Sequence, residues 1–250
     1  MNKLLVIVVL ILLIVCIINS KETFQSNNDI KAYVINLDES KDRLKLISNQ
    51  CKKEGLKFER LSAVNGRILN IENMDIVENK KMDKGAIGCS LSHINLWKKA
   101  KANGDKMFIV LEDDCILRNN FNKKIKKFMD EAPNDWDIIY LGGSNLKGKK
   151  ISKNLMKPVK VDKKSTHNTG TYGMLINSKC VDTLIENNMP IKENIDQNLK
   201  NNLYEKLNVF FAVPPCVVHN NNLDSMRRLN SGKTPTTKWF SRVQNKITLV

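Results

Sequence analysis

The chain has 250 residues, of which 42% are hydrophobic and 27% are charged, and these values exclude a disordered or low-complexity protein. A chain of this length can bury a sizeable core without disulfide or metal staples. Its 41 Lys and Arg outnumber its 26 Asp and Glu, which gives a net charge of +15. These basic residues are scattered and are not interleaved with aromatic side chains, so we expect no nucleic-acid partner.

An unbroken apolar run at the N-terminus extends from Leu4 to Ile18. As a helix it would be about 22 Å long, shorter than the ~30 Å hydrocarbon core of a bilayer, but its polar flanks can reach the interfaces. A cleaved signal peptide is the alternative, although no small-residue cleavage site follows the run. We therefore expect residues 1–20 to be a single-pass signal anchor in a membrane, followed by a polar linker at 21–29. Lys3 and Lys21 flank the run on both sides, which leaves its orientation and the compartment open.

From Ile30 onwards, short β-rich runs alternate with segments of helical periodicity. Strands are predicted at residues 32–37, 57–63, 106–111, 136–141, 171–176, 209–213 and 217–218. Helices are predicted from Asp38, as the N-cap, to Gly55, and at residues 85–101, 178–186 and 196–204. This alternation is typical of an α/β sandwich with a mainly parallel sheet, which we place at residues 30–225. The remaining residues, 226–250, are expected to form a basic C-terminal tail.

Three consecutive carboxylates, Glu112, Asp113 and Asp114, directly follow the predicted strand at 106–111. Such a cluster is costly to bury, because the charges repel one another and resist desolvation. Ligands of open α/β sheets bind beyond the carboxyl ends of the strands, and carboxylate oxygens are preferred ligands of Mn²⁺ and Mg²⁺. In an extended chain the first and third side chains point the same way, as in the D-x-D motif of nucleotide-sugar transferases. A solvated turn before the next helix is the alternative, and the triplet alone does not decide between them.

Six segments resemble, in the same order, the motifs of glycosyltransferase family 25, the family of lipooligosaccharide and collagen galactosyltransferases. They are AYVINLDESKDR at 32–43, FERLSAVNG at 58–66, GAIGCSLSHINLW at 85–97, FIVLEDD at 108–114, DIIYLGG at 137–143, and the strand at 170–176 followed by Ile195-Asp196. The second segment departs from the family pattern, because Asn65 stands where an acid is common. The resemblance covers roughly residues 30–225.

The resemblance implies a GT-A fold, which is a nucleotide-binding α/β sandwich with a mixed, mainly parallel central sheet. It also implies transfer of a hexose, usually galactose, from a UDP-sugar to a saccharide or hydroxylated acceptor, with inversion and with Mn²⁺ or Mg²⁺ as the cation. Such activity fits lipopolysaccharide biosynthesis. A non-catalytic nucleotide-sugar- or glycan-binding module on the same scaffold is the alternative. The intact Glu-Asp-Asp motif favours the enzyme.

The resemblance assigns roles to the acidic triplet and to a distant histidine. Asp114 is the first expected metal ligand, and Glu112 holds the ribose or a second metal position. Asp113 orients the loop or contacts the donor sugar. Many GT-A enzymes take a further metal ligand from the C-terminal region, and His219 is the candidate here, although the family does not clearly place a histidine at this point.

Other expected site residues lie at strand ends and on the predicted helix at 85–101. The donor nucleotide is expected to contact Asn36, Leu37, Asp38, Arg43, Asn65, Gly66 and Ser92. For Arg43 the alternative is an ordinary helix-surface position, and for Gly66 a simple turn. His93 is expected to hydrogen-bond the donor or to position the acidic loop, with a satisfied core histidine as the alternative. Asp196 is the expected catalytic base for the acceptor hydroxyl, with a helix-start acid as its alternative.

Overall fold

The computed structural model describes residues 30–220, 223 and 247–249. The chain divides into two units, residues 1–30 and 31–250. The predicted anchor at 1–20 and the linker at 21–29 lie outside the described residues. Within the part that is described, we find no helix long and apolar enough to cross a membrane.

A nine-stranded sheet forms the centre of the second unit, in the order β11-β6-β7-β9-β5-β8-β3-β1-β2 across the described residues. Its strands are β1 (Lys31–Asn36), β2 (Phe58–Ser62), β3 (Met107–Glu112), β5 (Ile138–Ser144), β6 (Leu146–Lys150), β7 (Leu155–Pro158), β8 (Thr169–Asn177), β9 (Val209–Ala212) and β11 (Ile247–Leu249). The pairings make β7 and β8 run against the other strands. The sheet is therefore mixed but mostly runs in one direction, and the predicted α/β class is confirmed.

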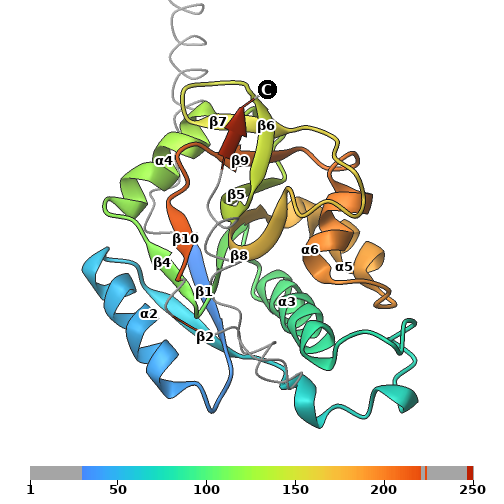
Figure 1. Cartoon of the computed structure of the whole chain (residues 1–250). Helices are drawn as coiled ribbons and strands as arrows, with labels where there is room; N and C mark the ends of the chain where they lie inside the picture. Colours follow the sequence, from blue (N-terminus) through green and yellow to red (C-terminus); the bar gives the residue numbers. More distant parts are fainter. Residues whose placement is uncertain (1–29, 221–222, 224–246, 250) are drawn as a thin grey trace, which may run out of the picture. The chain divides into compact units, whose positions relative to one another are not determined.

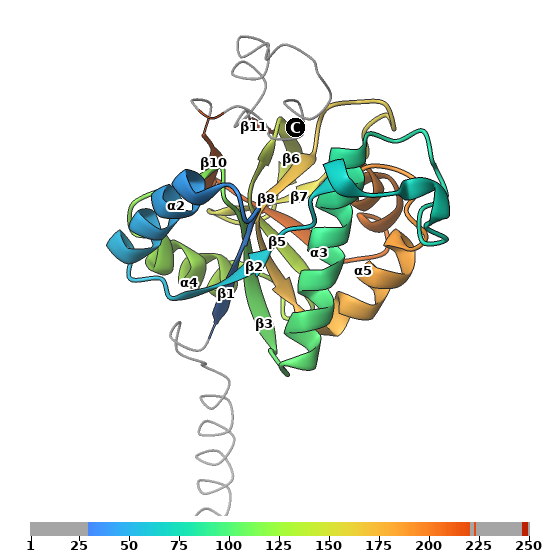
Figure 2. The same cartoon turned by 90° about the horizontal axis from the view of Figure 1, so that it is seen from below.

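Helices cover both faces of this sheet (Figures 1 and 2). One face carries α2 (Lys41–Lys53) and α4 (Phe121–Glu131), and the other carries α3 (Lys84–Ala102), α5 (Val181–Asn188) and α6 (Ile195–Asn198). Helix α3 has an unusually wide buried face, because it packs between the sheet and α5. The large side chains of Trp97 on α3 and of Tyr33 and Phe108 on the sheet are fully buried.

Short elements complete the fold around the two helical layers. The 3-10 helices η2 (Gly66–Ile68) and η3 (Ile71–Asn73) precede α3, η4 (Ser178–Cys180) leads into α5, and the π-helical turn η5 (Leu199–Leu203) continues α6. A second sheet consists of β4 (Cys115–Leu117) and β10 (Val217–His219), which pair antiparallel. The strands and helices expected from the sequence up to β10 are all present, with boundaries that differ by a few residues.

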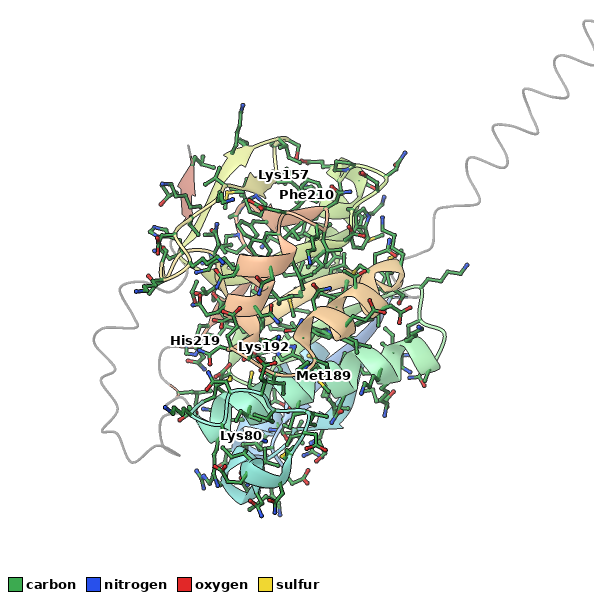
Figure 3. The ribbon with its side chains drawn as sticks, turned by 90° about the vertical axis from the view of Figure 1, so that its right-hand side faces the viewer. Lys80, Lys157, Met189, Lys192, Phe210 and His219 are labelled. Atoms are coloured by element: carbon green, nitrogen blue, oxygen red, sulfur yellow. The ribbon has the colours of Figure 1, made fainter. Side chains whose placement is uncertain are left out.

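The sequence did not predict β4, α4, β6, β7 or β11. Strand β6 is rich in lysine and β7 has only four residues, and both lie toward one edge of the sheet, where the apolar pattern of a buried strand is not required. Their neighbour β9 is covered in part by a cation–π contact, since Lys157 lies 5.9 Å from the ring centre of Phe210 (Figure 3). Of the expected tail at 226–250, the structure describes only residues 247–249, which form the edge strand β11.

The prediction that Asp38 caps the first helix is wrong. The N-cap of α2 is Ser40, and its side chain makes no capping hydrogen bond. The Asp38 carboxylate instead accepts hydrogen bonds from Arg60 and from Ser62 Oγ. These partners on β2 draw the carboxylate away from the helix. Gly55 does follow the helix end as predicted, with φ +66°.

Candidate active site

A cavity of about 270 Å³ opens at the carboxyl ends of β1 and β3. The antiparallel strand β8 lies between β3 and β5, so its first residues arrive at the same edge of the sheet. Most of the residues predicted for the site line this cavity. They are Asn36, Leu37, Arg43, Gly66, Ser92, His93, Glu112, Asp113, Asp114, Asp196 and His219.

Asp113 is the anchor of the acidic triplet. Its Oδ1 lies 3.0 Å from Arg43 Nη1 on α2, and its Oδ2 accepts a 2.6 Å hydrogen bond from Asn36 Nδ2 at the end of β1. Burial raises the pKa of Asp113, as does the charge of Asp114, while Asn36 and Arg43 act in the opposite direction. Both carboxylate oxygens are therefore committed to holding the loop against β1 and α2.

The amide of Asn36 is held in one orientation by Arg60 on β2. Arg60 Nε donates a 2.9 Å hydrogen bond to Asn36 Oδ1, and its Nη2 donates to the Asn36 carbonyl at 3.2 Å. Because Oδ1 is taken by a donor, Nδ2 must face the carboxylate of Asp113. Arg60 thus acts on the acidic loop through Asn36.

Asp114 presents an unsatisfied oxygen. Its Oδ2 lies 3.5 Å from both Arg43 Nη1 and His219 Nε2, while its buried Oδ1 has no hydrogen-bond partner among the described residues. Burial raises the pKa of Asp114, but the hydrogen bond and charge of His219, together with Arg43, outweigh it and hold the pKa below its usual value. An ionised, buried and partly unpaired carboxylate is a costly arrangement that a bound cation would offset.

His219 reaches Asp114 through the pairing of β10 with β4. In this pairing His219 lies opposite Cys115, and the backbone N–H of Asn220 donates a 2.8 Å hydrogen bond to the Asp114 carbonyl. The strand can approach the large sheet because residue 142 is glycine, where a Cβ atom would meet the Val217 carbonyl oxygen at 2.0 Å. His219, labelled in Figure 3, is thereby brought to the acidic triplet.

Glu112 is held from two elements on the other side of the cavity. Its Oε1 accepts a 2.7 Å hydrogen bond from Thr171 Oγ1 on β8 and lies 3.1 Å from His93 Nε2 on α3. The His93 ring is fully buried, and its centre lies 6.1 Å from that of Trp97. His93 therefore contacts the acidic motif directly, as one of the two predicted alternatives requires.

Ser92 and Gly66 shape the opposite wall. Ser92 Oγ donates to the Gly88 carbonyl at 2.7 Å and accepts from Val64 N–H at 2.8 Å, which ties the segment before η2 to α3. A Cβ atom at Gly66 would meet the Lys84 carbonyl oxygen at 2.0 Å, so the close approach of this turn to α3 requires glycine. Both residues fix backbone that lines the cavity.

Asp196 lies in the first turn of α6, whose N-cap is Asn194. Its Oδ2 accepts a 3.2 Å hydrogen bond from the Gly170 N–H, and its Oδ1 accepts from the Gln197 N–H at 2.8 Å. It is the carboxylate of the cavity wall that lies outside the acidic triplet. These contacts join α6 to the start of β8.

Two predicted residues do not line the cavity. Asp38 is exposed, and the hydrogen bond from Arg60 lowers its pKa. Asn65 is the N-cap of η2, where its Oδ1 accepts from the Arg67 N–H at 3.0 Å and its Nδ2 donates to Glu39. Both residues form hydrogen bonds that stabilise the backbone next to the site.

Several lining residues had no assigned role in the sequence. They are Cys89, Ser144, Thr171, Tyr172 and Asn194. The strand containing Thr171 was predicted, but nothing in its pattern shows that β8 is antiparallel and starts at the cavity. Cys89 stands in the histidine-containing segment at 85–97, but no role was predicted for it. Strand β8 is buried along almost its whole length, so its pattern carries no signal that singles out Thr171.

Comparison with known proteins gives the family. A family model described as glycosyltransferase family 25 (LPS biosynthesis protein) matches residues 29–199, more than half of the chain. The chain belongs to glycosyltransferase family 25. This family-25 chain is 29% identical over 136 residues to procollagen galactosyltransferase 2 of Homo sapiens and 31% identical over 128 residues to a glycosyltransferase 25 family member of Aedes aegypti.

These matches cover 48% and 46% of this family-25 chain, and 22% and 21% of the two relatives. The chain thus spans about a fifth of the length of the curated relatives it matches. A further relative, 28% identical over 127 residues, is named probable inactive glycosyltransferase 25 family member 3 of Bos taurus; that match covers 45% of this chain and 21% of the relative. Among solved structures, a glycosyltransferase involved in glycosylation of the major capsid of PBCV-1 aligns with a TM-score of 0.43 and 10% identity, over 73% of this chain and 80% of that one.

Proposed function

We propose that the protein is a cation-dependent glycosyltransferase that moves a hexose, galactose in the first instance, from a UDP-sugar to a glycan or a hydroxylated protein. The observation that carries the proposal is the buried Oδ1 of Asp114, which has no hydrogen-bond partner among the described residues. It lies beside His219, after the carboxyl end of β3 and on the wall of the cavity. Family membership supports transfer of a sugar. The position of the acidic motif on parallel strands β2-β1-β3 supports a GT-A type of fold.

The donor set at this point fits a divalent cation such as Mn²⁺ or Mg²⁺. Asp114 offers a carboxylate oxygen and His219 an imidazole nitrogen, and Mn²⁺ accepts both kinds of ligand. Glu112 lies on the same cavity wall as a second acidic group. When bound, the cation would supply positive charge that neutralises the diphosphate leaving group.

The residues around Asp114 serve the donor side of the reaction. Asp113, Arg43 and Asn36 form a connected network that fixes the loop before any ligand arrives. Such preorganisation lets the loop bind an anionic nucleotide without reordering its own side chains. The ends of β1 and β2 and the turn at Gly66 line the half of the cavity that we assign to the nucleotide.

Asp196 serves the acceptor side in this proposal. Inverting transfer needs a base that takes the proton of the attacking hydroxyl while the sugar leaves the diphosphate. Two backbone N–H groups, of Gly170 and Gln197, hold the Asp196 carboxylate in place. It is separate from the triplet, where a bound cation would suppress the basicity of a carboxylate.

The same proposal includes the expected organisation of the chain. Residues 1–20 anchor the protein in a membrane, residues 21–29 link the anchor to the enzyme, residues 30–225 form the transferase domain, and residues 226–250 extend beyond it. An apolar run followed by a polar linker supports this division.

The test is a donor screen with the full-length chain, a panel of UDP-hexoses and Mn²⁺, with release of UDP and the mass of the glycosylated acceptor as readouts. The proposal expects UDP release that depends on the cation and is abolished in Asp114→Asn but kept in Asp130→Asn. Asp130 is a suitable control because it is an exposed acid on α4, paired with Lys126. UDP binding without release of UDP from any donor would instead identify a non-catalytic nucleotide-sugar-binding module.

A further inference from the structure

A cluster of three metal-ligating side chains lies beside the donor site. One ligand atom each from Cys89, His93 and Glu112 lies within 4.8 Å of the other two, and all three residues line the cavity. Cys89 and His93 are four residues apart on α3, so they share one face of the helix. Glu112 comes from the end of β3. The cluster therefore combines a sulfur, a nitrogen and an oxygen donor from two rigid elements.

The buried imidazole of His93 lacks a full set of partners. Nε2 faces Glu112 Oε1 at 3.1 Å, and Nδ1 is buried without a hydrogen-bond partner among the described residues. If Nε2 carries the proton, the lone pair of Nδ1 is unpaired. If Nδ1 carries the proton, it is an unpaired donor and Nε2 directs its lone pair at the carboxylate. Neither neutral tautomer satisfies the ring. A cation bound to Nε2 would fix the proton on Nδ1 and take up the Nε2 lone pair that otherwise faces the Glu112 carboxylate.

The thiol of Cys89 differs from the other thiols that the structure describes. Cys51, Cys115, Cys180 and Cys216 are buried, whereas Cys89 is half-buried and lines the cavity. A cation that enters the cavity can therefore reach this sulfur. A thiolate ligand favours zinc over the hard cations that carboxylates prefer.

We propose that Cys89, His93 and Glu112 form a binding site for Zn²⁺, distinct from the Mn²⁺ or Mg²⁺ position at Asp114. Three protein ligands with a fourth position open to the cavity is the arrangement of accessible zinc sites. Two nitrogen or oxygen ligands about 2.0–2.1 Å from a tetrahedral ion lie roughly 3.4 Å apart, close to the 3.1 Å between His93 Nε2 and Glu112 Oε1. On binding, the Cys89 thiol gives its proton to solvent and the sulfur bonds the metal as thiolate.

The first test uses Co²⁺ as a spectroscopic substitute for Zn²⁺ on the full-length chain, without UDP-sugar. We expect a thiolate-to-cobalt charge-transfer band in the near ultraviolet, which Zn²⁺ abolishes by displacement. The band should be lost in Cys89→Ser and kept in Cys180→Ala, a cysteine that does not line the cavity. The Zn²⁺ affinity of Cys89→Ser and His93→Gln should fall by about 100-fold or more. Removing only a hydrogen-bond partner of a metal ligand already lowers metal affinity by about 10–100-fold, and these variants remove a ligand itself.

A second measurement needs no variant. Zn²⁺ should protect Cys89 from alkylation by iodoacetamide, as read by peptide mass spectrometry, while Mg²⁺ should not. Absence of the cobalt band, a band that persists in Cys89→Ser, or labelling of Cys89 that Zn²⁺ does not slow would each overturn the zinc site. None of these readouts uses sugar transfer. The zinc site can therefore be confirmed or refuted whatever the outcome of the transferase test, and a negative zinc result does not bear on the transferase proposal.

Discussion

His219 Nε2 lies 3.5 Å from Asp114 Oδ2, although the two residues are far apart in the sequence. Asp114 directly precedes β4, His219 ends β10, and the antiparallel pairing of these strands brings them together. Asp114 Oδ1 stays buried and without a hydrogen-bond partner among the residues that the structure describes.

Asp114→Asn should remove the cation dependence of UDP binding. The amide keeps the shape of the side chain but loses the charge that a cation needs, so we expect affinity in the presence of Mn²⁺ to fall by about 100-fold or more. Calorimetric titration of UDP with and without Mn²⁺ measures this, with Asp130→Asn as the control. Equal Mn²⁺-dependent affinity in Asp114→Asn and the parent chain would remove the metal assignment.

Asp196→Asn should lower turnover by about 10²–10⁴-fold, the usual effect of losing a general base. The affinity for the UDP-sugar should stay within a few fold, because Asp196 is not part of the acidic triplet. Initial rates at saturating donor, together with equilibrium donor binding, separate the two effects. Asp182→Asn, on an exposed acid of α5 that pairs with Lys101, is the matched control. Normal turnover in Asp196→Asn would exclude it as the base, and lost donor binding would move it to the donor pocket.

Arg60→Leu should weaken donor binding even though Arg60 does not line the cavity. Without its two hydrogen bonds Asn36 Oδ1 loses its donor, and an unsatisfied buried acceptor costs about 1–3 kcal/mol. The amide is then free to turn its oxygen toward Asp113, which would loosen the acidic loop. Calorimetry should show weaker UDP binding in this variant and not in Arg118→Leu, an exposed arginine after β4. Identical UDP affinity in both variants would contradict the positioning role.

Gly142→Ala should destabilise the fold and the site together. The added Cβ would meet the Val217 carbonyl oxygen at 2.0 Å, which is backbone and has to move. Such overpacking typically costs 1–3 kcal/mol, and the displaced β10 would carry His219 away from Asp114. The temperature of thermal unfolding and the Mn²⁺-dependent affinity for UDP should both fall. A variant that unfolds at the parent temperature and binds UDP normally would show that β10 does not need this close approach.

A chain that begins after residue 20 should fold and retain activity but lose membrane association. The apolar run is separated from β1 by a polar linker, so the core described here does not require it. Carbonate extraction of membranes from cells that express each form gives the first readout, and UDP release gives the second. Extraction of the full-length protein into the soluble fraction would refute the anchor.

The sequence predicted the parts of the fold that have a strong local pattern. Strands β1 and β3 are continuous apolar runs, and α3 carries a wide stripe of small and apolar residues, so each was expected close to its observed bounds. Strands β6 and β11 were not expected, because β11 is the edge strand and β6 lies next to it, where a strand does not need buried side chains on both faces.

In the site, too, residues in a local sequence motif were predicted, whereas contacts that depend on long-range strand pairing were not. The acidic triplet and His93 were found from local motifs. The contact of Thr171 with Glu112 depends on β8 running antiparallel beside β3, and the contact of His219 with Asp114 depends on the pairing of two three-residue strands. No local pattern specifies such long-range registers. Asp38 was assigned to the site from its place after a strand, but Arg60 holds it outside the cavity.

Strand β8 runs antiparallel to β3, so it reaches the cavity with its N-terminal end. Strands β1 and β3 contribute their final residues to it, whereas β8 contributes its first, so the loop at residues 159–168 runs directly into the cavity wall at Gly170 and Thr171. Insertions or exchanges in that loop can reshape the wall without altering the register of β1 and β3, which carry the acidic motif. On the proposed function, in which Asp196 beside Gly170 serves the acceptor, grafting of residues 159–168 between family members would alter the acceptor side of the cavity.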